Sequence, residues 1–246
     1  MMQYEDPIFS SVFPILQIEE NKRVSIAGTS VLVRLFDLPF LVTAAHVLRK
    51  NGNTNPLFLP FSGQNIQIDG PASMTPVGTG NDLDIAVFDL RMQPALLESF
   101  SGYKAISLES PSEIPIHERS HYYVFGYPST RAKYYNPDKL IDITPLDYIS
   151  DEVNEELYET YKADKQSNIL VGYNPKTTIN QKKAKTTAPH PYGASGGPLF
   201  RILIDKNDHP IIWIFEGIMT EWKNKKVIQS TRKSVIRSFI LKMICN

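Results

Sequence analysis

The chain has 246 residues, 42% of them hydrophobic and 21% charged, a composition typical of a globular protein with one large all-β domain or two small ones. Basic and acidic side chains both number 26, so the net charge indicates no particular partner. Cys245 is the only cysteine, which excludes a disulfide within the chain and a metal site built from cysteines.

The charges are unevenly distributed along the chain. Residues 1–160 carry 11 basic and 21 acidic side chains, whereas residues 161–246 carry 15 and 5. Such asymmetry can mark an acidic or nucleic-acid partner, and it can also mean that two halves of one fold attract each other. We favour the second interpretation and expect no nucleic-acid partner, because no basic run is interleaved with aromatic residues.

The N-terminus has the features of neither a signal peptide nor a membrane helix. No basic residue precedes Lys22, and Pro7 and Pro14 interrupt the apolar positions. No other run approaches about 18 apolar residues. We therefore expect a cytoplasmic protein that does not contact a membrane.

Short strand-like runs dominate the chain. The segments "RVSIAGTSVLVRLF" and "PFLVTAAHVL" flank a predicted turn at Asp37-Leu38-Pro39 and have the pattern of a hairpin. Further runs follow, each bounded by Pro, Gly, Asn or Asp: "LDIAVFDL", "HYYVFGYP", "SNILVGY", "GGPLFRILI" and "PIIWIFEGIM". Many short strands without intervening helices predict β-barrels or sandwiches, not a parallel α/β sheet.

Two stretches are predicted to be helical. The internal one covers residues 150–164, where Val153, Leu157 and Tyr161 share one face and the first turn is acidic. The terminal one carries a continuous apolar stripe, which predicts a helix that docks on the domain. Its apolar residues are Val235, Ile236, Phe239, Ile240, Met243 and Ile244. Between the two halves of the chain, a stretch rich in Pro, Ser and Glu at 108–120 predicts a boundary.

The segment "APHPYGASGGPLF", residues 188–200, packs three glycines and a proline around Ser195. A serine becomes a nucleophile when a base takes its proton, and the resulting oxyanion needs aimed donors. Gly193 can turn its N–H toward a substrate carbonyl, because glycine adopts conformations closed to other residues. Ser195 adds a second N–H, and the glycines at 196 and 197 leave room for substrate. The alternative is a structural glycine turn.

A base for this serine is sought among five histidines. His46 is the candidate because it lies in "LVTAAHVL", at the end of a predicted apolar strand where two alanines allow another segment to approach closely. The alternative is a core histidine. Three others lie in polar or Pro-flanked surroundings and are predicted to be surface or turn residues: His117, His121 and His209.

A third group must hold the imidazole in one tautomer. The segment "NDLDIAVFDL" offers Asp82, Asp84 and Asp89. Asp84 directly precedes an apolar run, where it can be partly buried, whereas Asp82 and Asp89 are expected to face solvent.

The motifs "TAAH", "DIAV" and "GASGGPL", in that order, resemble those of the trypsin-like (chymotrypsin-fold) serine peptidases. The segments "AGTSVLV", "VFGYP" and "FEGIMT" also fit, so the resemblance covers roughly residues 22–244. It implies a single peptidase domain over 1–246, with two six-stranded antiparallel β-barrels at about 20–110 and 118–230 and a terminal helix at about 231–244. The active site would lie between the barrels.

The resemblance also implies the chemistry. Peptide bonds would be hydrolysed through an acyl-enzyme on Ser195, with His46 as general base and Asp84 as its orienting group. The N–H groups of Gly193 and Ser195 would form the oxyanion hole. A protein or peptide is the implied substrate, and the mechanism needs neither a metal nor an organic cofactor.

The sequence departs from the family in two places. Ala194 stands where digestive relatives have an aspartate that pairs with a new amino terminus, so activation by that route is not expected; this is closer to bacterial, intracellular or HtrA-like branches. The expected floor of the specificity pocket falls on Pro189, which argues against a preference for Lys or Arg. His190 and Tyr192 are candidates to line the pocket, and Thr220 lies on its expected wall. His190 could favour acidic substrate side chains, or it could be a surface histidine.

Three alternatives stay open. The long segment 129–187, with the predicted helix and the basic "QKKAK" at 181–185, could select substrates or could be a solvated decoration. The protein could be a peptidase that is latent until a regulatory partner activates it. It could also be a non-catalytic binding or scaffold protein on the same fold.

Overall fold

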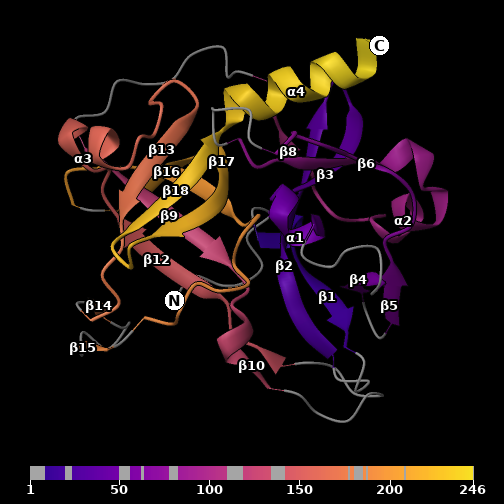
Figure 1. Cartoon of the computed structure of the whole chain (residues 1–246), viewed down its shortest axis with the longest axis horizontal. Helices are drawn as coiled ribbons and strands as arrows, with labels where there is room; N and C mark the ends of the chain where they lie inside the picture. The colour runs from indigo at the N-terminus through magenta and orange to yellow at the C-terminus, as the bar shows by residue number, and fades with distance from the viewer. Residues whose placement is uncertain are drawn as a thin grey trace.

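A computed structural model describes eleven parts of the chain, namely residues 9–19, 24–49, 56–61, 64–77, 83–109, 119–133, 142–176, 178–179, 185–186, 188–207 and 209–245. Most of the regular secondary structure is antiparallel β-sheet, arranged in two large sheets (Figure 1). A C-terminal helix, α4 (Lys233–Cys245), lies along the top of that view. None of the helices in these parts is long and apolar enough to cross a membrane.

The first sheet has eight strands in the order β5-β4-β1-β2-β3-β7-β6, and β8 pairs with β2 in the one parallel arrangement of this sheet. Its strands are β1 (Val12–Ile18), β2 (Val24–Leu35), β3 (Leu38–Thr43), β4 (Leu57–Phe61), β5 (Gln64–Gln67), β6 (Ala72–Met74), β7 (Ala86–Asp89) and β8 (Ile106–Ser107). A short helix, η1 (Phe9–Ser11), precedes β1, and three others lie between later strands: α1 (Ala45–Arg49), η2 (Leu90–Met92) and α2 (Pro94–Ser99).

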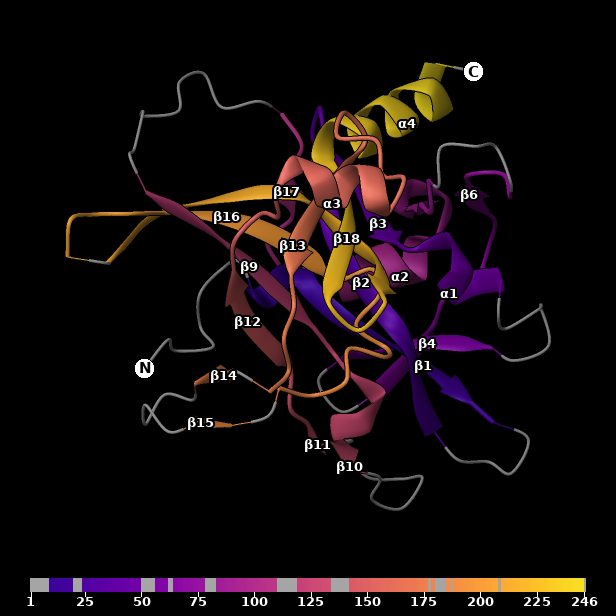
Figure 2. The same ribbon diagram turned by 60° about the vertical axis from the view of Figure 1, so that its left-hand side comes forward.

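The second sheet has six strands in the order β12-β9-β16-β17-β18-β13, all antiparallel. They are β9 (Ser120–Gly126), β12 (Leu146–Ser150), β13 (Asn168–Gly172), β16 (Pro198–Ile204), β17 (Pro210–Lys223) and β18 (Val227–Arg232). The long β16–β17 hairpin extends outward at the left of Figure 2. Smaller elements complete this half: η3 (Ser129–Arg131), α3 (Glu155–Thr160), and the pairs β10 (Ala132–Lys133) with β11 (Asp142–Ile143) and β14 (Thr178–Ile179) with β15 (Lys185–Thr186).

The expectation of a β-rich fold with two antiparallel sheets and a terminal helix is confirmed. Two closed six-stranded barrels are not confirmed: the first sheet has eight strands, and among the described residues no pairing joins the end strands of either sheet. Most of the predicted boundary at 108–120 lies outside the described residues. His117, Asp82 and residues 181–184 also lie outside them.

One apolar core joins the two sheets and α4. Val33 and Phe40 enter it from the first sheet, Phe125 and Phe200 from the second, and Ile240 from α4. Each of these side chains is at most 2% exposed. The two halves therefore pack on each other through a shared interior, which fixes the position of the loops between them.

The β2–β3 hairpin is present, but its turn is not the predicted one. Phe36 and Asp37 form the turn with φ of 50° and 62°, whereas Leu38 already pairs with Leu35. Two successive positive φ values are what a two-residue hairpin requires to match the twist of its strands. Leu38 and Pro39 therefore belong to β3.

The predicted helix at 150–164 is much shorter than expected. Glu152 bridges to Val171 in extended backbone, and the Asn154 side chain accepts from the Leu157 N–H at 3.3 Å, so α3 begins only at residue 155. The helix ends before Tyr161, and its buried side chain is Tyr158. Backbone pairing and an N-cap thus override the apolar spacing in this segment.

The hydroxyl of Tyr158 donates to Glu152 at 2.7 Å and accepts from the Leu170 N–H at 2.9 Å. Tyr122 donates to the same carboxylate at 3.1 Å. Burial is the largest cause that raises the pKa of both tyrosines above the ordinary value. Both phenols therefore stay protonated donors, and α3 is tied to the second sheet.

We expect Ile240→Ala to lower the free energy of unfolding by about 2–5 kcal/mol, because it leaves a cavity where α4 meets both sheets. Chemical denaturation measures this change. Lys242→Ala, on the exposed side of the same helix, is the control and should change stability little. Equal effects of the two variants would contradict the packing described for α4.

Candidate active site

His46 lies in the first turn of α1, not at the end of a strand as expected. Strand β3 ends at Thr43, which pairs with Ala86 of β7, and α1 begins at Ala45. Ala44 and Ala45 are completely buried, so the backbone between β3 and α1 is tightly packed. This places the imidazole at the surface of a cavity, with 28% of the side chain exposed.

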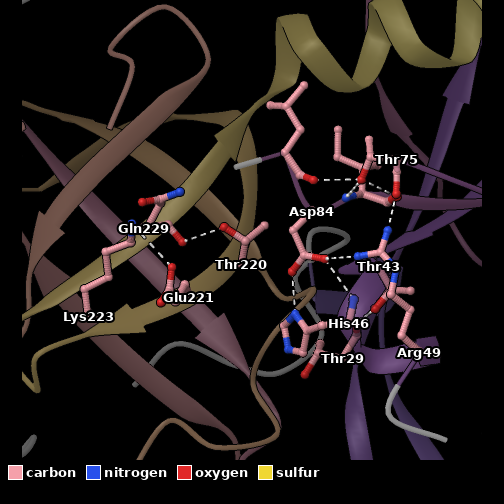
Figure 3. Close-up of polar contacts among 12 residues, drawn as sticks. Thr29, Thr43, His46, Arg49, Thr75, Asp84, Thr220, Glu221, Lys223 and Gln229 are labelled. Atoms are coloured by element: carbon pink, nitrogen blue, oxygen red, sulfur yellow. Dashed lines mark hydrogen bonds and ion pairs between the residues drawn. The ribbon is translucent and has the colours of Figure 1, made fainter. Parts of the chain in front are cut away.

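Asp84 holds His46 with both carboxylate oxygens. Oδ2 contacts the Nδ1 of the imidazole, and Oδ1 accepts from the His46 backbone N–H at 2.8 Å (Figure 3). As predicted, Asp84 lies just before the apolar strand β7 and is partly buried, with 20% of its side chain exposed. Because an ionised carboxylate only accepts hydrogen bonds, a neutral imidazole in this contact carries its proton on Nδ1 and keeps the lone pair on Nε2.

Ser195 lies in a tight loop that is pinned on both sides. Its carbonyl accepts from the Thr29 N–H at 2.8 Å, and the N–H of Gly196 donates to the Met219 carbonyl at 2.7 Å. Gly196 has φ of 88°, and a Cβ on it would lie 2.0 Å from the Thr29 carbonyl oxygen. Only glycine permits this close approach of the loop to β2.

The peptide between Tyr192 and Gly193 has a fixed orientation. Its carbonyl accepts from the backbone N–H of Ser129 at 2.8 Å and from the Ser129 hydroxyl at 3.2 Å. In a trans peptide the N–H points opposite to the carbonyl, so the Gly193 N–H is turned away from Ser129. Within the described parts of the chain, the structure gives no acceptor for the N–H groups of Gly193 and Ser195. Ser195 lines the cavity described below, whereas Gly193 is buried and is not among the lining residues.

Thr29 connects the serine loop to the first sheet. Its hydroxyl donates to the Gly193 carbonyl at 3.2 Å and accepts from the Tyr127 N–H at 2.9 Å. Its own carbonyl accepts from the Thr43 hydroxyl at 2.7 Å. Thr29 and Thr43 are both completely buried. The same residue therefore contacts the strand that leads to His46 and the loop that carries Ser195.

A cavity of about 400 Å³ brings the candidate residues together. His46, Asp84 and Ser195 all line it, and so do His190, Tyr192 and Thr220, the three residues expected in the substrate pocket. Four further lining residues were not predicted from the sequence: Pro191, Glu221, Trp222 and Gln229. Their signal in the sequence is weak, because strand position alone does not tell which residues of β17 and β18 reach the cavity.

Two of the lining side chains, His190 and Trp222, contact each other. His190 and Trp222 meet edge to face, with ring centroids 4.4 Å apart. Pro189, the expected floor, is absent from the lining, and its carbonyl accepts from the Tyr173 hydroxyl. The Glu221 carboxylate lies 3.4 Å from the ammonium of Lys223, which offsets its charge. Thr220 is buried, and its hydroxyl donates to the Gln229 carbonyl at 3.2 Å.

The other sequence candidates lie away from the cavity. His121 pairs with Asp151 at 2.6 Å, and His209 lies 3.5 Å from Asp205. Asp89 was expected to face solvent, but only 17% of its side chain is exposed, and it pairs with Arg91 at 2.6 Å. The side-chain hydrogen bond from Arg91 holds the pKa of Asp89 below its ordinary value.

No protein-family model matches the chain, and no curated protein matches its sequence. A solved structure described as "Aromatic interactions drive the coupled folding and binding of the intrinsically disordered Sesbania mosaic virus VPg protein" is similar to it, with a TM-score of 0.48 and 15% sequence identity. The alignment covers 92% of this chain and 89% of that chain. A likeness of this degree carries no argument about activity.

We expect Thr29→Val to lower the free energy of unfolding by about 1–3 kcal/mol, because the change keeps the shape but removes the hydroxyl shared by Gly193 and Tyr127. Thr29→Ser keeps the hydroxyl and is the matched control. Denaturant titration of both variants measures the difference. If valine and serine are equally well tolerated, the hydroxyl does not hold the loop.

Proposed function

We propose that the protein is a serine endopeptidase that hydrolyses peptide bonds through an acyl-enzyme on Ser195. The observation that carries the proposal is the paired His46 and Asp84 in one cavity with Ser195. The loop of this serine has two N–H groups, those of Gly193 and Ser195, that have no acceptor among the described residues. The finer architecture proposed with it is that of a trypsin-like peptidase, with one β-barrel formed around each sheet and the site between them.

The first step is attack by the Ser195 hydroxyl on the substrate carbonyl. The free lone pair on Nε2 of His46 takes the hydroxyl proton as the Oγ–C bond forms. Asp84 keeps the imidazole in the required tautomer and stabilises the imidazolium through its contact with Nδ1. The result is a tetrahedral intermediate with a negative oxygen.

The N–H groups of Gly193 and Ser195 accommodate this oxyanion. The Gly193 N–H needs no rearrangement to do so, because Ser129 already holds the carbonyl of the same peptide, that of Tyr192, on the opposite side. The intermediate collapses when His46 returns its proton to the leaving amine. A water molecule, activated by the same histidine, then hydrolyses the acyl-enzyme and restores Ser195.

The lining of the cavity limits the substrate side chain that precedes the cleaved bond. The Glu221 carboxylate is paired with Lys223, so a preference for Lys or Arg is not expected. His190 offers a donor to an acidic side chain. The contact between His190 and Trp222 restricts the depth available to a large side chain.

Control of this peptidase would not use a released amino terminus. Ala194 is completely buried and uncharged, and its N–H donates to the Pro191 carbonyl at 2.9 Å. A regulatory partner, if it is needed, would act on access to the cavity. The alternative is a non-catalytic binding protein on the same fold, which would hydrolyse no peptide in the experiment below.

The proposal predicts that wild-type protein hydrolyses a mixed peptide library and that Ser195→Ala abolishes this activity. Asp84→Asn should reduce kcat by about 10⁴, because the amide no longer selects the correct tautomer. Asp89→Asn, a carboxylate paired with Arg91 outside the cavity, is the matched control and should retain activity. Activity that survives in Ser195→Ala would refute the proposal.

Trp222→Ala should open the cavity toward larger substrate side chains. The expected result is a rise of about tenfold in kcat/KM for a peptide with Phe before the cleaved bond, relative to one with Ala. Trp222→Phe keeps a ring against His190 and should retain the wild-type ratio. An unchanged ratio in a folded Trp222→Ala variant would show that this contact does not limit the substrate.

A further inference from the structure

Arg49 reaches the same carboxylate as His46. It lies three residues later in α1, so both side chains lie on one face of this short helix. Its Nη1 is 3.8 Å from Asp84 Oδ1, the oxygen that accepts from the His46 backbone N–H. The Arg49 side chain is 30% exposed and that of Asp84 20%, so solvent screens this pair only in part.

Through Thr75, Arg49 also restrains Leu83 and Ile85, the two residues on either side of Asp84. Its Nη2 donates to the Thr75 carbonyl. The Thr75 hydroxyl donates to the Leu83 carbonyl at 2.8 Å and accepts from the Ile85 N–H at 3.1 Å. Arg49 is thus linked to Asp84 directly and through Thr75, and Asp84 in turn accepts from the His46 backbone N–H (Figure 3).

The guanidinium also changes the electrostatics of the pair. Its charge is permanent, and it lies beside the carboxylate that stabilises the protonated imidazole. Because a positive charge opposes a second one nearby, we expect removal of the Arg49 charge to favour the protonated form of the imidazole. The other titratable side chains lining the cavity are His190, Tyr192 and Glu221, and Glu221 is paired with Lys223.

We propose that Arg49 is a positioning residue that fixes the Asp84 carboxylate and, through it, the orientation of the His46 imidazole. This inference rests on the proposed peptidase function for its kinetic consequence. Its electrostatic consequence can be measured without turnover. Arg49 itself does not reach the reacting atoms, because it acts through Asp84.

The test compares Arg49→Met with wild type in two measurements. In NMR titrations of Ser195→Ala protein, with the His46 signal assigned by His46→Gln, the midpoint should rise by about half a pH unit in Arg49→Met. In the active protein, the acid limb of the pH dependence of kcat/KM should rise by the same amount. The value of kcat should fall about tenfold with KM unchanged, because the carboxylate loses a restraint.

Two further variants separate charge from shape. Arg49→Lys keeps the charge and should retain the wild-type midpoint, although kcat stays reduced because the fork of donors is lost. Arg34→Met removes an arginine that pairs with Asp37 on the surface, and it should leave both measurements unchanged. This control excludes a general effect of net charge.

The NMR titration decides the proposal even if the peptidase function fails. An unchanged midpoint in folded Arg49→Met overturns the role of Arg49. A raised midpoint in a protein that hydrolyses no peptide supports the role of Arg49 and counts against the proposed function. A reduced kcat with an unchanged midpoint and acid limb would show that Arg49 is merely structural, which also overturns the proposal.

Discussion

The whole site depends on the contact between Thr29 and the loop that carries Ser195. His46 and Asp84 belong to the first half of the chain, and the serine loop belongs to the second. Thr29 bonds to that loop at two points, through its N–H to Ser195 and through its hydroxyl to Gly193. The shared apolar core aligns the two halves, but only such directed bonds can set the loop to within a fraction of an ångström. The absence of a side chain on Gly196 makes this approach possible.

A second constraint is the short helix that follows β3. Because α1 starts one residue after Ala44, its first turn projects the His46 backbone N–H and imidazole toward the same carboxylate. The last residue of the helix, Arg49, approaches that carboxylate from another side. Five residues of helix thus provide the proposed base, one of its restraints and a nearby positive charge. A longer strand in this place would have turned successive side chains to opposite faces.

Several features could be predicted from the sequence because their signals are local. The glycines around Ser195 indicate a backbone that other residues cannot adopt, and φ of 93° at Gly193 agrees with this. The apolar run after Asp84 placed that carboxylate correctly beside a buried strand. The helix at His46 was missed because the mostly apolar segment "LVTAA" precedes it and continues the strand pattern. The helix at 150–164 was overestimated, since the spacing of its apolar residues does not reveal the N-cap at Asn154.

The residues that the sequence did not reveal act over long distances in the chain. Thr29 and Gly193 are 164 positions apart, and no periodicity links them. Thr75 supports Asp84 through backbone pairing whose register depends on the whole first sheet. Arg49 is the exception, because its position one helical turn from His46 would have suggested a shared face if the helix had been recognised. Trp222 reaches His190 only because two distant segments converge at the cavity.

The central claim is that Ser195 is activated by His46 and Asp84 in the folded protein. Intact-mass spectrometry after incubation with a fluorophosphonate measures this most directly, followed by peptide mapping of the modified residue. The account predicts a single phosphonyl adduct on Ser195 in wild type and none in His46→Ala. A folded wild-type protein that forms no adduct, or an adduct on another residue, would contradict it.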